Sequence, residues 1–257
     1  MAKAQLLRIS LTLATVLLAW QAIVWLADVP PFILPSPPAV WSQLMAEAET
    51  ILNHAAITLA EIALGMGLGI LGGASAAIVM ASSNRAAREL LPLLVASQAI
   101  PVFAIAPLLV LWLGYGMASK VAMAALIIFF PVTATLLQGL RRVDPALDEL
   151  TRMMAQGVKG ASLRRLIHVR LPAALPSFGD GLRVAAAIAP IGAVLGEWVG
   201  ASEGLGYAMM QANARMKTDL MFACLAVLAV LAVTLYFTVD MVMRRATRWT
   251  TAKETHT

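Results

Sequence analysis

Residues 163–176 read L-R-R-L-I-H-V-R-L-P-A-A-L-P, a basic stretch that runs directly into a hydrophobic segment. The arginines favour water, whereas the apolar residues that follow favour lipid or a packed core. This change of polarity is typical of a water-facing connector that enters a membrane helix. Since the rest of the chain offers little polar surface, we expect partners to contact the chain at this connector.

Composition predicts a membrane protein. The chain has 257 residues, of which 60% are hydrophobic and only 13% are charged, with a mean hydropathy of +0.82. Soluble domains carry roughly a quarter charged residues. No soluble fold of this size buries so much apolar surface, so lipid must cover it. We therefore predict an all-α, multi-pass protein of the bacterial inner (plasma) membrane, built as one transmembrane domain over residues 1–257.

Six segments are long enough to cross the hydrocarbon core, which takes about 20 helical residues. We place them near Leu6–Ala27, Ala55–Ala81, Leu90–Leu113, Ser119–Leu140, Leu175–Gly200 and Leu220–Met243. The third contains Pro92, Pro101 and Pro107, and we expect kinks there because proline removes a backbone hydrogen bond. A cleaved signal peptide is the alternative for the first segment, but its apolar region would be shorter and no A-x-A site follows.

The basic residues predict that both termini face the cytoplasm. Fifteen lysines and arginines fall at the chain ends or in the second and fourth connectors, against three on the other side. The cytoplasmic group is Lys3, Arg8, Arg85, Arg88, Arg141, Arg142, Arg152, Lys159, Arg164, Arg165, Arg170, Arg244, Arg245, Arg248 and Lys253. The outer group is Lys120, Arg215 and Lys217, while Arg183 lies within a span.

The connectors carry their own patterns. Prolines make residues 30–38 a stiff extended segment on the outer face, and Val40–Ile51 reads as either a short surface helix or a plain connector. Gly65 and Gly69 form a G-x-x-x-G pair, which lets helix backbones approach closely within the chain or between copies. The cytoplasmic loop over about 141–172 is long enough for two short helices, joined near Gly157 and Gly160.

Residue types exclude several kinds of chemistry. One cysteine, Cys224, rules out a disulfide framework, and the three histidines have no metal-ligand spacing. No phosphate-binding G-x-x-x-x-G-K-[ST] sequence is present, so energy from ATP must come from a partner. We expect no catalytic residue, cofactor or metal. An intramembrane protease would need a histidine base at membrane depth, and none is placed there.

The cytoplasmic loop resembles the loop signature of permease subunits of ATP-binding-cassette (ABC) importers. The matching residues are Gly160-Ala161-Ser162, Val169, Leu171-Pro172 and Ala173-Ala174-Leu175-Pro176. Leu34-Pro35-Ser36-Pro37 and Gly204-Leu205-Gly206-Tyr207 resemble the nitrate, sulfonate and taurine branch. Ala189–Trp198 and Gln211–Met216 resemble permeases for hydroxymethylpyrimidine, a thiamine precursor.

The resemblance implies a six-helix, type I importer bundle that works as a pair of permeases, with a homodimer favoured. Two ATPases and a solute-binding protein would complete the transporter, with membrane lipid around it and no nucleic acid. The loop would contact the ATPase through Asp148, Glu149, Met153, Lys159, Gly160, Ala161, Ser162, Leu171 and Pro172. The chain departs from the family pattern, because Lys159 stands at the usual glycine position and Met153 or Met154 at the acidic one.

Five residues are candidates for the translocation path of a small polar solute, and they are Gln98, Pro101, Phe103, Glu197 and Trp198. Charged residues inside spans are costly and therefore functional candidates. Asp180 and Arg183, three residues apart, favour a local ion pair instead. An ion-coupled secondary transporter is the alternative function, although it would be expected to show inverted repeats, and the sequence has no visible repeat.

Overall fold

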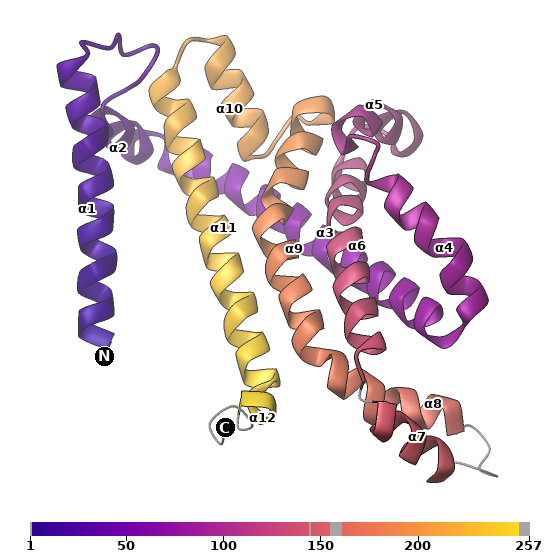
Figure 1. Ribbon diagram of the computed structural model, residues 1–257. Coiled ribbons are helices and arrows are strands. Elements are labelled where there is room, and N and C mark those ends of the chain that lie inside the picture. The colour runs from indigo at the N-terminus through magenta and orange to yellow at the C-terminus, as the bar shows by residue number, and fades with distance from the viewer. Residues whose placement is uncertain (1, 144, 155–160, 252–257) are drawn as a thin grey trace. The chain divides into compact units, whose positions relative to one another are not determined.

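The computed structural model describes residues 2–143, 145–154 and 161–251. Every regular element in these ranges is helical (Figure 1), as expected for an all-α membrane protein. In chain order the elements are α1 (Ala2–Leu26), α2 (Pro37–Ala46), α3 (Ala48–Ser82), α4 (Asn84–Ser97), α5 (Val102–Leu113), α6 (Met117–Arg141), α7 (Pro145–Met154), α8 (Ala161–Arg165), the π-helical turn η1 (Leu166–Arg170), α9 (Leu171–Gly200), α10 (Leu205–Ala214), α11 (Thr218–Ala246) and α12 (Arg248–Thr251).

Helix lengths test the predicted spans. Among the described residues, four helical stretches are long and apolar enough to cross a membrane: α3, α6, the continuous stretch Leu163–Gly200, and α11. The predicted third span, Leu90–Leu113, is not one continuous helix, because α4 and α5 meet at an angle of 99°. Pro101 precedes α5 and cannot donate the backbone hydrogen bond that would continue α4. The count is thus four, or five with this pair as one span, and six spans remain a prediction.

The proline-rich residues 30–38, predicted to be extended throughout, end in helix α2. Pro37 and Pro38 form the first turn of α2, where a helix needs no backbone N–H groups. The Ser36 hydroxyl accepts a hydrogen bond from the Ala39 N–H at 3.4 Å and caps this end. The helix ends at Ala46, so Ile51 of the predicted Val40–Ile51 segment belongs to α3.

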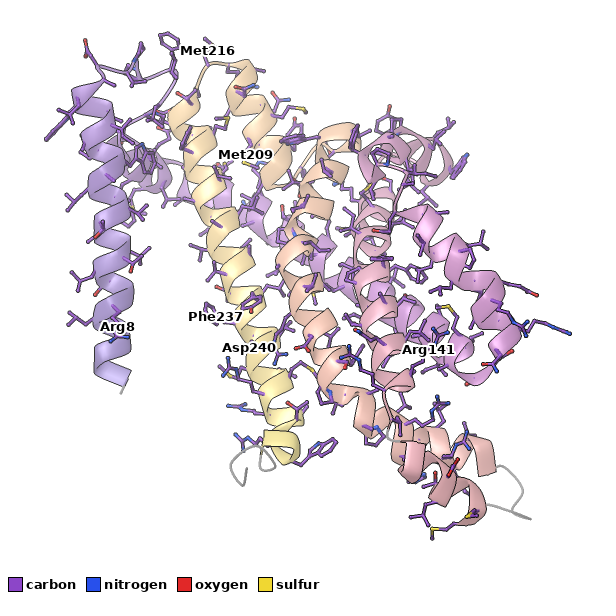
Figure 2. The ribbon with its side chains drawn as sticks, in the orientation of Figure 1. Arg8, Arg141, Met209, Met216, Phe237 and Asp240 are labelled. Atoms are coloured by element: carbon purple, nitrogen blue, oxygen red, sulfur yellow. The ribbon has the colours of Figure 1, made fainter. Side chains whose placement is uncertain are left out.

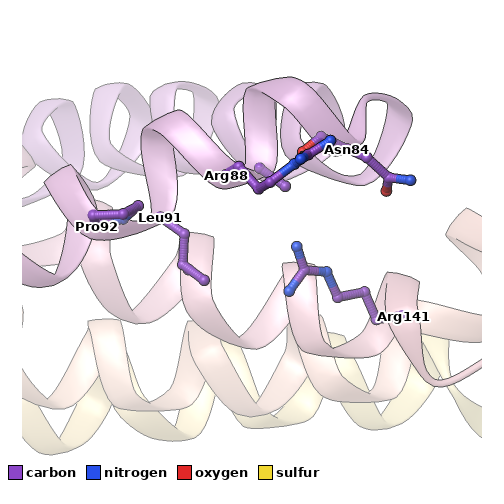
Figure 3. A pocket seen from close by; sticks show the side chains of 6 residues that line it. Asn84, Arg88, Leu91, Pro92 and Arg141 are labelled. Carbon is purple, nitrogen blue, oxygen red and sulfur yellow. The ribbon is translucent and has the colours of Figure 1, made fainter.

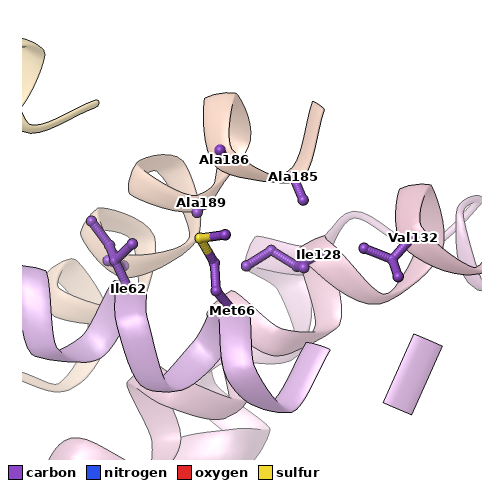
Figure 4. Packing of buried hydrophobic residues seen from close by; sticks show 8 residues of the cluster. Ile62, Met66, Ile128, Val132, Ala185, Ala186 and Ala189 are labelled. Atoms are coloured by element: carbon purple, nitrogen blue, oxygen red, sulfur yellow. The ribbon is translucent and has the colours of Figure 1, made fainter. Parts of the chain in front are cut away.

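The chain divides into two compact units, which are considered separately. Unit 1 comprises residues 1–58 and 202–230, and unit 2 comprises 59–201 and 231–257. In unit 2, α6 runs alongside α9 over much of its length (Figure 1). The core of this unit forms where α3, α6 and α9 meet. Figure 4 shows its central residues: Ile62 and Met66 of α3, Ile128 and Val132 of α6, and Ala185, Ala186 and Ala189 of α9.

Glycine allows α3 to approach α6 closely. A Cβ atom on Gly69 would lie 2.9 Å from the Ala125 carbonyl oxygen, and one on Gly73 would lie 2.9 Å from that of Phe129. Gly65, one turn earlier, faces Ala124 of α6 in the same way. The G-x-x-x-G pair therefore packs helices within the chain. Gly192 and Gly196 of α9 allow a similarly close approach to α6, at Ala124 and Lys120.

In unit 1, side chains from α3 accept hydrogen bonds from the backbone N–H groups at the start of α10. The Gly204 N–H donates to His54 Nδ1 at 3.0 Å, and the Leu205 N–H donates to the Thr58 hydroxyl at 2.8 Å. The first N–H groups of a helix have no partner inside the helix, so His54 and Thr58 act as its cap. Gly204 has a φ of +115°, a conformation that favours glycine.

Candidate functional site

A buried ion pair connects α3 to α6. Lys120 Nζ donates to Glu61 Oε1 at 2.7 Å, and the two side chains are 6% and 0% exposed. The residues lie 59 positions apart in the sequence, so helix packing alone brings them together. Charges at this depth persist only when they are paired.

Glu197 of α9 completes what we call the buried charge cluster, which consists of Glu61, Lys120 and Glu197. Glu197 is fully buried and acts on Glu61 through both charge and hydrogen bonding. Gly196 makes this arrangement possible, because a Cβ atom there would lie 3.0 Å from the Lys120 Cα. The Lys120–Glu61 ion pair and the buried Glu197 carboxyl group thus lie where three membrane helices meet.

Lys120 was counted among the three basic residues of the outer side, inside the predicted span Ser119–Leu140. It lies in the first turn of α6 and is only 5% exposed. A buried, paired lysine reports packing within the bundle and carries no information about orientation. Arg215 and Lys217 remain as the exposed basic residues of that side.

A second group, the exposed charge network, joins α9 to α11 in unit 2. Arg183 donates from Nη1 to Asp180 Oδ1 at 2.8 Å, which confirms the predicted local ion pair. Arg183 Nε also donates to Asp240 Oδ1 at 2.8 Å, and Arg244 Nε donates to Asp240 Oδ2 at 2.7 Å. Asp240 lies near the C-terminal end of α11 (Figure 2) and receives hydrogen bonds from both arginines.

Arg170 of η1 binds the ends of two other helices. Its guanidinium donates to the Ala81 carbonyl of α3 at 3.2 Å and to the Leu140 carbonyl of α6 at 2.9 Å. The last carbonyls of a helix lack partners in the helix and attract cations. Arg170, one of the basic residues predicted for the cytoplasmic side, thus bonds to helix ends within the chain.

The two short helices predicted in the cytoplasmic loop are present as α7 and α8. Leu150, Met153 and Met154 lie on one face of α7 and are 54%, 70% and 75% exposed. A helix with such a face usually rests against another surface. α8, η1 and α9 follow without interruption, so the connector continues into the long stretch that ends at Gly200.

Comparisons with known proteins agree with this architecture. The family described as "Binding-protein-dependent transport system inner membrane component" matches residues 69–251. The chain belongs to this family of ABC permeases. It is accordingly a multi-pass inner-membrane protein. A probable ABC transporter permease of Haemophilus influenzae is 52% identical over 95% of this chain and 98% of its own length. The formylaminopyrimidine transport permease ThiX of Halalkalibacterium halodurans is 40% identical, over 79% of this chain and 80% of its own.

Solved structures share the fold of this permease. The methionine ABC transporter MetNI, in an inward-facing conformation, contains a chain that superposes with a TM-score of 0.67. The match covers 78% of the permease and 98% of that chain, with 18% sequence identity. Identity at this level shows the fold alone, and the bundle is that of an ABC importer permease.

The predicted coupling residues of the permease occupy several elements. Met153 lies on the exposed apolar face of α7, and Glu149 is also exposed. Leu171 and Pro172 begin α9 directly after η1. Ala161 and Ser162 begin α8, although their side chains, like that of Asp148, lie outside the described part. Lys159 and Gly160 fall wholly outside the described residues.

The structure does not gather the predicted path residues of the permease into one site. Gln98 and Pro101 lie at the break between α4 and α5, and Phe103 in α5 is 62% exposed. Glu197 is buried in the charge cluster, whereas Trp198, the next residue, is 51% exposed. A solute contact at Glu197 would require the bundle to open, and the path residues remain predictions.

Sequence reasoning missed the partners of the buried residues. Charges within spans were predicted only to be functional candidates, and Lys120 was counted among the outer basic residues without a partner. The sequence did hold one signal for the Glu61–Lys120 pair, because an acidic and a basic residue at membrane depth in different helices usually pair with each other. His54 and Thr58, spaced four apart on α3, gave no local signal, since their partners at Gly204 and Leu205 lie about 150 residues away.

Unit 2 also holds a cavity of about 540 Å³ between the start of α4 and the end of α6. Figure 3 shows Arg88 of α4 and Arg141 of α6 at this cavity, together with Leu91 and Pro92. The two arginines belong to the group that predicts the cytoplasmic side, where anionic lipid headgroups attract such residues.

Proposed function

We propose that this permease is the membrane-spanning subunit of a binding-protein-dependent importer and forms the translocation path for a small polar solute. An aminopyrimidine related to hydroxymethylpyrimidine, a thiamine precursor, is the favoured solute. The observation that carries this preference is the 40% identity to a formylaminopyrimidine permease over most of both chains. Sulfonates, taurine and nitrate are the alternatives, because two sequence stretches resemble that branch.

The proposed assembly contains two copies of this permease, two ATPase subunits and a solute-binding protein outside the cytoplasm. The exposed face of α7 supports the ATPase contact, because Leu150, Met153 and Met154 present apolar surface on a helix that membrane lipid would not cover. The chain holds no phosphate-binding loop, so the ATPase subunits hydrolyse the ATP.

The contacts of Arg170 support the proposed transmission of movement. An ATPase that closes on ATP would displace α7 and the connector after it. Since Arg170 bonds the ends of α3 and α6 to the start of α9, these helix ends would move together. ATP would thereby bias the permease between two arrangements by rigid-body movement.

Uptake by the complete transporter tests the proposal. The permease, its ATPase and its binding protein are reconstituted in proteoliposomes, and uptake of labelled amino-hydroxymethylpyrimidine, taurine and nitrate is compared with and without ATP. We expect ATP-dependent accumulation of the aminopyrimidine in preference to the other two. Accumulation that needs only a proton gradient would refute an ABC importer, and ATP-driven uptake of taurine or nitrate alone would refute the solute.

A variant of α7 adds a coupling arm to this experiment. Met153→Asp should weaken association with the ATPase roughly tenfold or more. The variant places a charge where burial of the Met153 side chain is expected to contribute about 1.5–3 kcal/mol to binding. Met216→Asp is a matched control, since Met216 is similarly exposed at 67% but lies in the turn after α10. Equal co-purification of the ATPase with both variants would contradict the role of α7.

A further inference from the structure

Unit 1 contains a cavity of about 230 Å³ that the proposed transport mechanism has not used. It lies between the first turns of α3, helix α10 and the start of α11, and we call it the α3–α10 cavity. Its volume is equal to that of about eight waters at roughly 30 Å³ each. Apolar residues such as Ile51 and Leu220 line part of it, and the remaining lining is polar or charged.

Histidine and tyrosine supply directed hydrogen-bonding groups at this cavity. His54 Nδ1 accepts the Gly204 N–H at 3.0 Å, so the proton of the neutral ring is on Nε2, which is then a donor. Gln211 Nε2 donates to the Tyr207 hydroxyl at 3.1 Å. The His54 and Tyr207 rings lie 6.2 Å apart between centroids and give the cavity an aromatic wall.

Charges of both signs line the same cavity. Glu47, which follows α2, contributes a carboxylate, while Arg215 and Lys217 contribute cations from the turn between α10 and α11. A ligand in this space would therefore meet an acceptor from one part of the chain and cationic donors from another.

The turn that carries the two cations has an unusual backbone. The Lys217 N–H donates to the Ala212 carbonyl at 2.9 Å, and the Met216 N–H donates to the Asn213 carbonyl at 3.0 Å. This pattern ends a helix with one residue in the left-handed conformation, usually glycine. Here the residue in this conformation is Met216, labelled in Figure 2, which has a φ of +58°. A non-glycine residue held at positive φ is a feature that clusters at ligand sites.

We propose that the α3–α10 cavity binds a small solute that carries an amino group and, apart from it, oxygen or nitrogen acceptors. The amino group would donate to Glu47, and the acceptors would receive hydrogen bonds from Arg215, Lys217 and His54. Aminopyrimidines and amino-sulfonates such as taurine share this chemistry. This inference rests on the proposed function and deepens it, because it assigns the solute a binding site on the permease itself.

The predicted topology agrees with a receiving site. Arg215 and Lys217 lie on the side that the basic residues assign to the outside. A cavity on that side is accessible to a solute released by a binding protein outside the cytoplasm. The cavity is smaller than the 300–1,000 Å³ typical of drug-sized ligands, which favours a solute of one ring or a short chain.

Direct binding to the permease tests the inference. The full chain in lipid nanodiscs, without ATPase or binding protein, is titrated with amino-hydroxymethylpyrimidine and with taurine by calorimetry. We expect saturable binding of at least one probe, and Glu47→Gln should weaken it about tenfold or more through loss of a charge-assisted hydrogen bond. Glu49→Gln is the matched control, because Glu49 is an exposed acid two residues further on, in the first turn of α3, and does not line the cavity.

Lys217→Gln and Arg215→Gln provide a second, independent arm should Glu47→Gln fail to fold, which thermal unfolding would reveal. Weaker binding of taurine alone would indicate a sulfonate as the ligand, and weaker binding of both probes an acceptor group that they share. The inference is overturned if neither probe binds saturably, or if all three variants bind like wild type.

Uptake separates this inference from the proposed function. If Glu47→Gln, Arg215→Gln and Lys217→Gln all leave ATP-driven uptake and solute binding unchanged, the proposed importer is supported and the cavity has no such role. The permease in nanodiscs could bind a probe at the cavity while the complete transporter does not accumulate that probe with ATP. This result would support the binding site and refute the proposed transported solute.

Discussion

Unit 2 contains two groups of charges that use the same residue types in opposite surroundings. In the buried charge cluster, the Lys120 and Glu61 side chains are 6% and 0% exposed. In the exposed charge network, Arg244 and Asp180 are 76% and 72% exposed, while Arg183 and Asp240 between them are partly covered. The buried cluster joins α3, α6 and α9, whereas the network joins α9 and α11.

The difference in exposure changes what each group contributes. Arg183 contacts two aspartates and Asp240 contacts two arginines, so each retains a partner when another is lost. The pairs with an exposed partner, Arg183–Asp180 and Arg244–Asp240, contribute little individually, whereas the side chains of the Arg183–Asp240 pair between them are 22% and 13% exposed. Lys120 is the one described cation shown to bond Glu61, and neither side chain can turn to water. The buried cluster should therefore fail as a whole when its lysine is removed, and the network should weaken by degrees.

Removing the buried cation should give the largest effect. Lys120→Met leaves Glu61 and Glu197 buried beside each other without a counter-charge, which we expect to lower the free energy of unfolding by about 3–5 kcal/mol. Thermal unfolding of the purified permease in detergent measures the change. A triple variant with Lys120→Met, Glu61→Met and Glu197→Gln should recover most of the loss, because it removes the uncompensated charges as well. If Lys120→Met alone were as stable as wild type, the stability of the bundle would not depend on a counter-charge in the buried charge cluster.

The buried cluster also marks the limit of what the sequence could predict. Periodicity and length were sufficient to predict α6 and α11 to within a few residues, because apolar runs of this length have one solution in a bilayer. The G-x-x-x-G pair correctly predicted close packing on one face of α3. The Asp180–Arg183 pair was predictable because its residues are three apart on one helix.

Contacts between distant segments were not predictable from local patterns. Asp240 joins Arg183 across 57 positions, and no rule of spacing along one helix indicates this partner. The 99° bend between α4 and α5 was anticipated only as a kink, because proline removes a hydrogen bond without determining where the next helix points. His54 appeared to lie at the edge of a span, and its role at Gly204 depends on a fold already formed.

Two glycines on α3 sharpen the comparison between the interior and the lipid-facing surface. A Cβ atom on Gly69 would meet the Ala125 carbonyl oxygen and Ile128, whereas one on Gly67 would have nothing within 4 Å. We expect Gly69→Val to cost about 1–3 kcal/mol by forcing α3 away from α6. Gly67→Val is the matched control and should leave the unfolding temperature nearly unchanged. Equal losses from both would show that helix propensity, and not the approach to α6, explains the glycines.

Substitutions in the exposed charge network should give the smallest effects, and they test whether its members are redundant. Asp240→Asn removes the acceptor charge shared by Arg183 and Arg244, so a modest fall in unfolding temperature is expected, smaller than that of Lys120→Met. Asp180→Asn is the control, because its carboxylate is largely in contact with solvent or headgroups and Arg183 keeps Asp240. It should change the unfolding temperature little in dilute buffer, and high salt should narrow the difference between the two variants. The contrast between the two groups would be wrong if Asp240→Asn lowered the unfolding temperature as much as Lys120→Met does, and by the same amount in high salt. The network would then be as well shielded from solvent as the buried charge cluster.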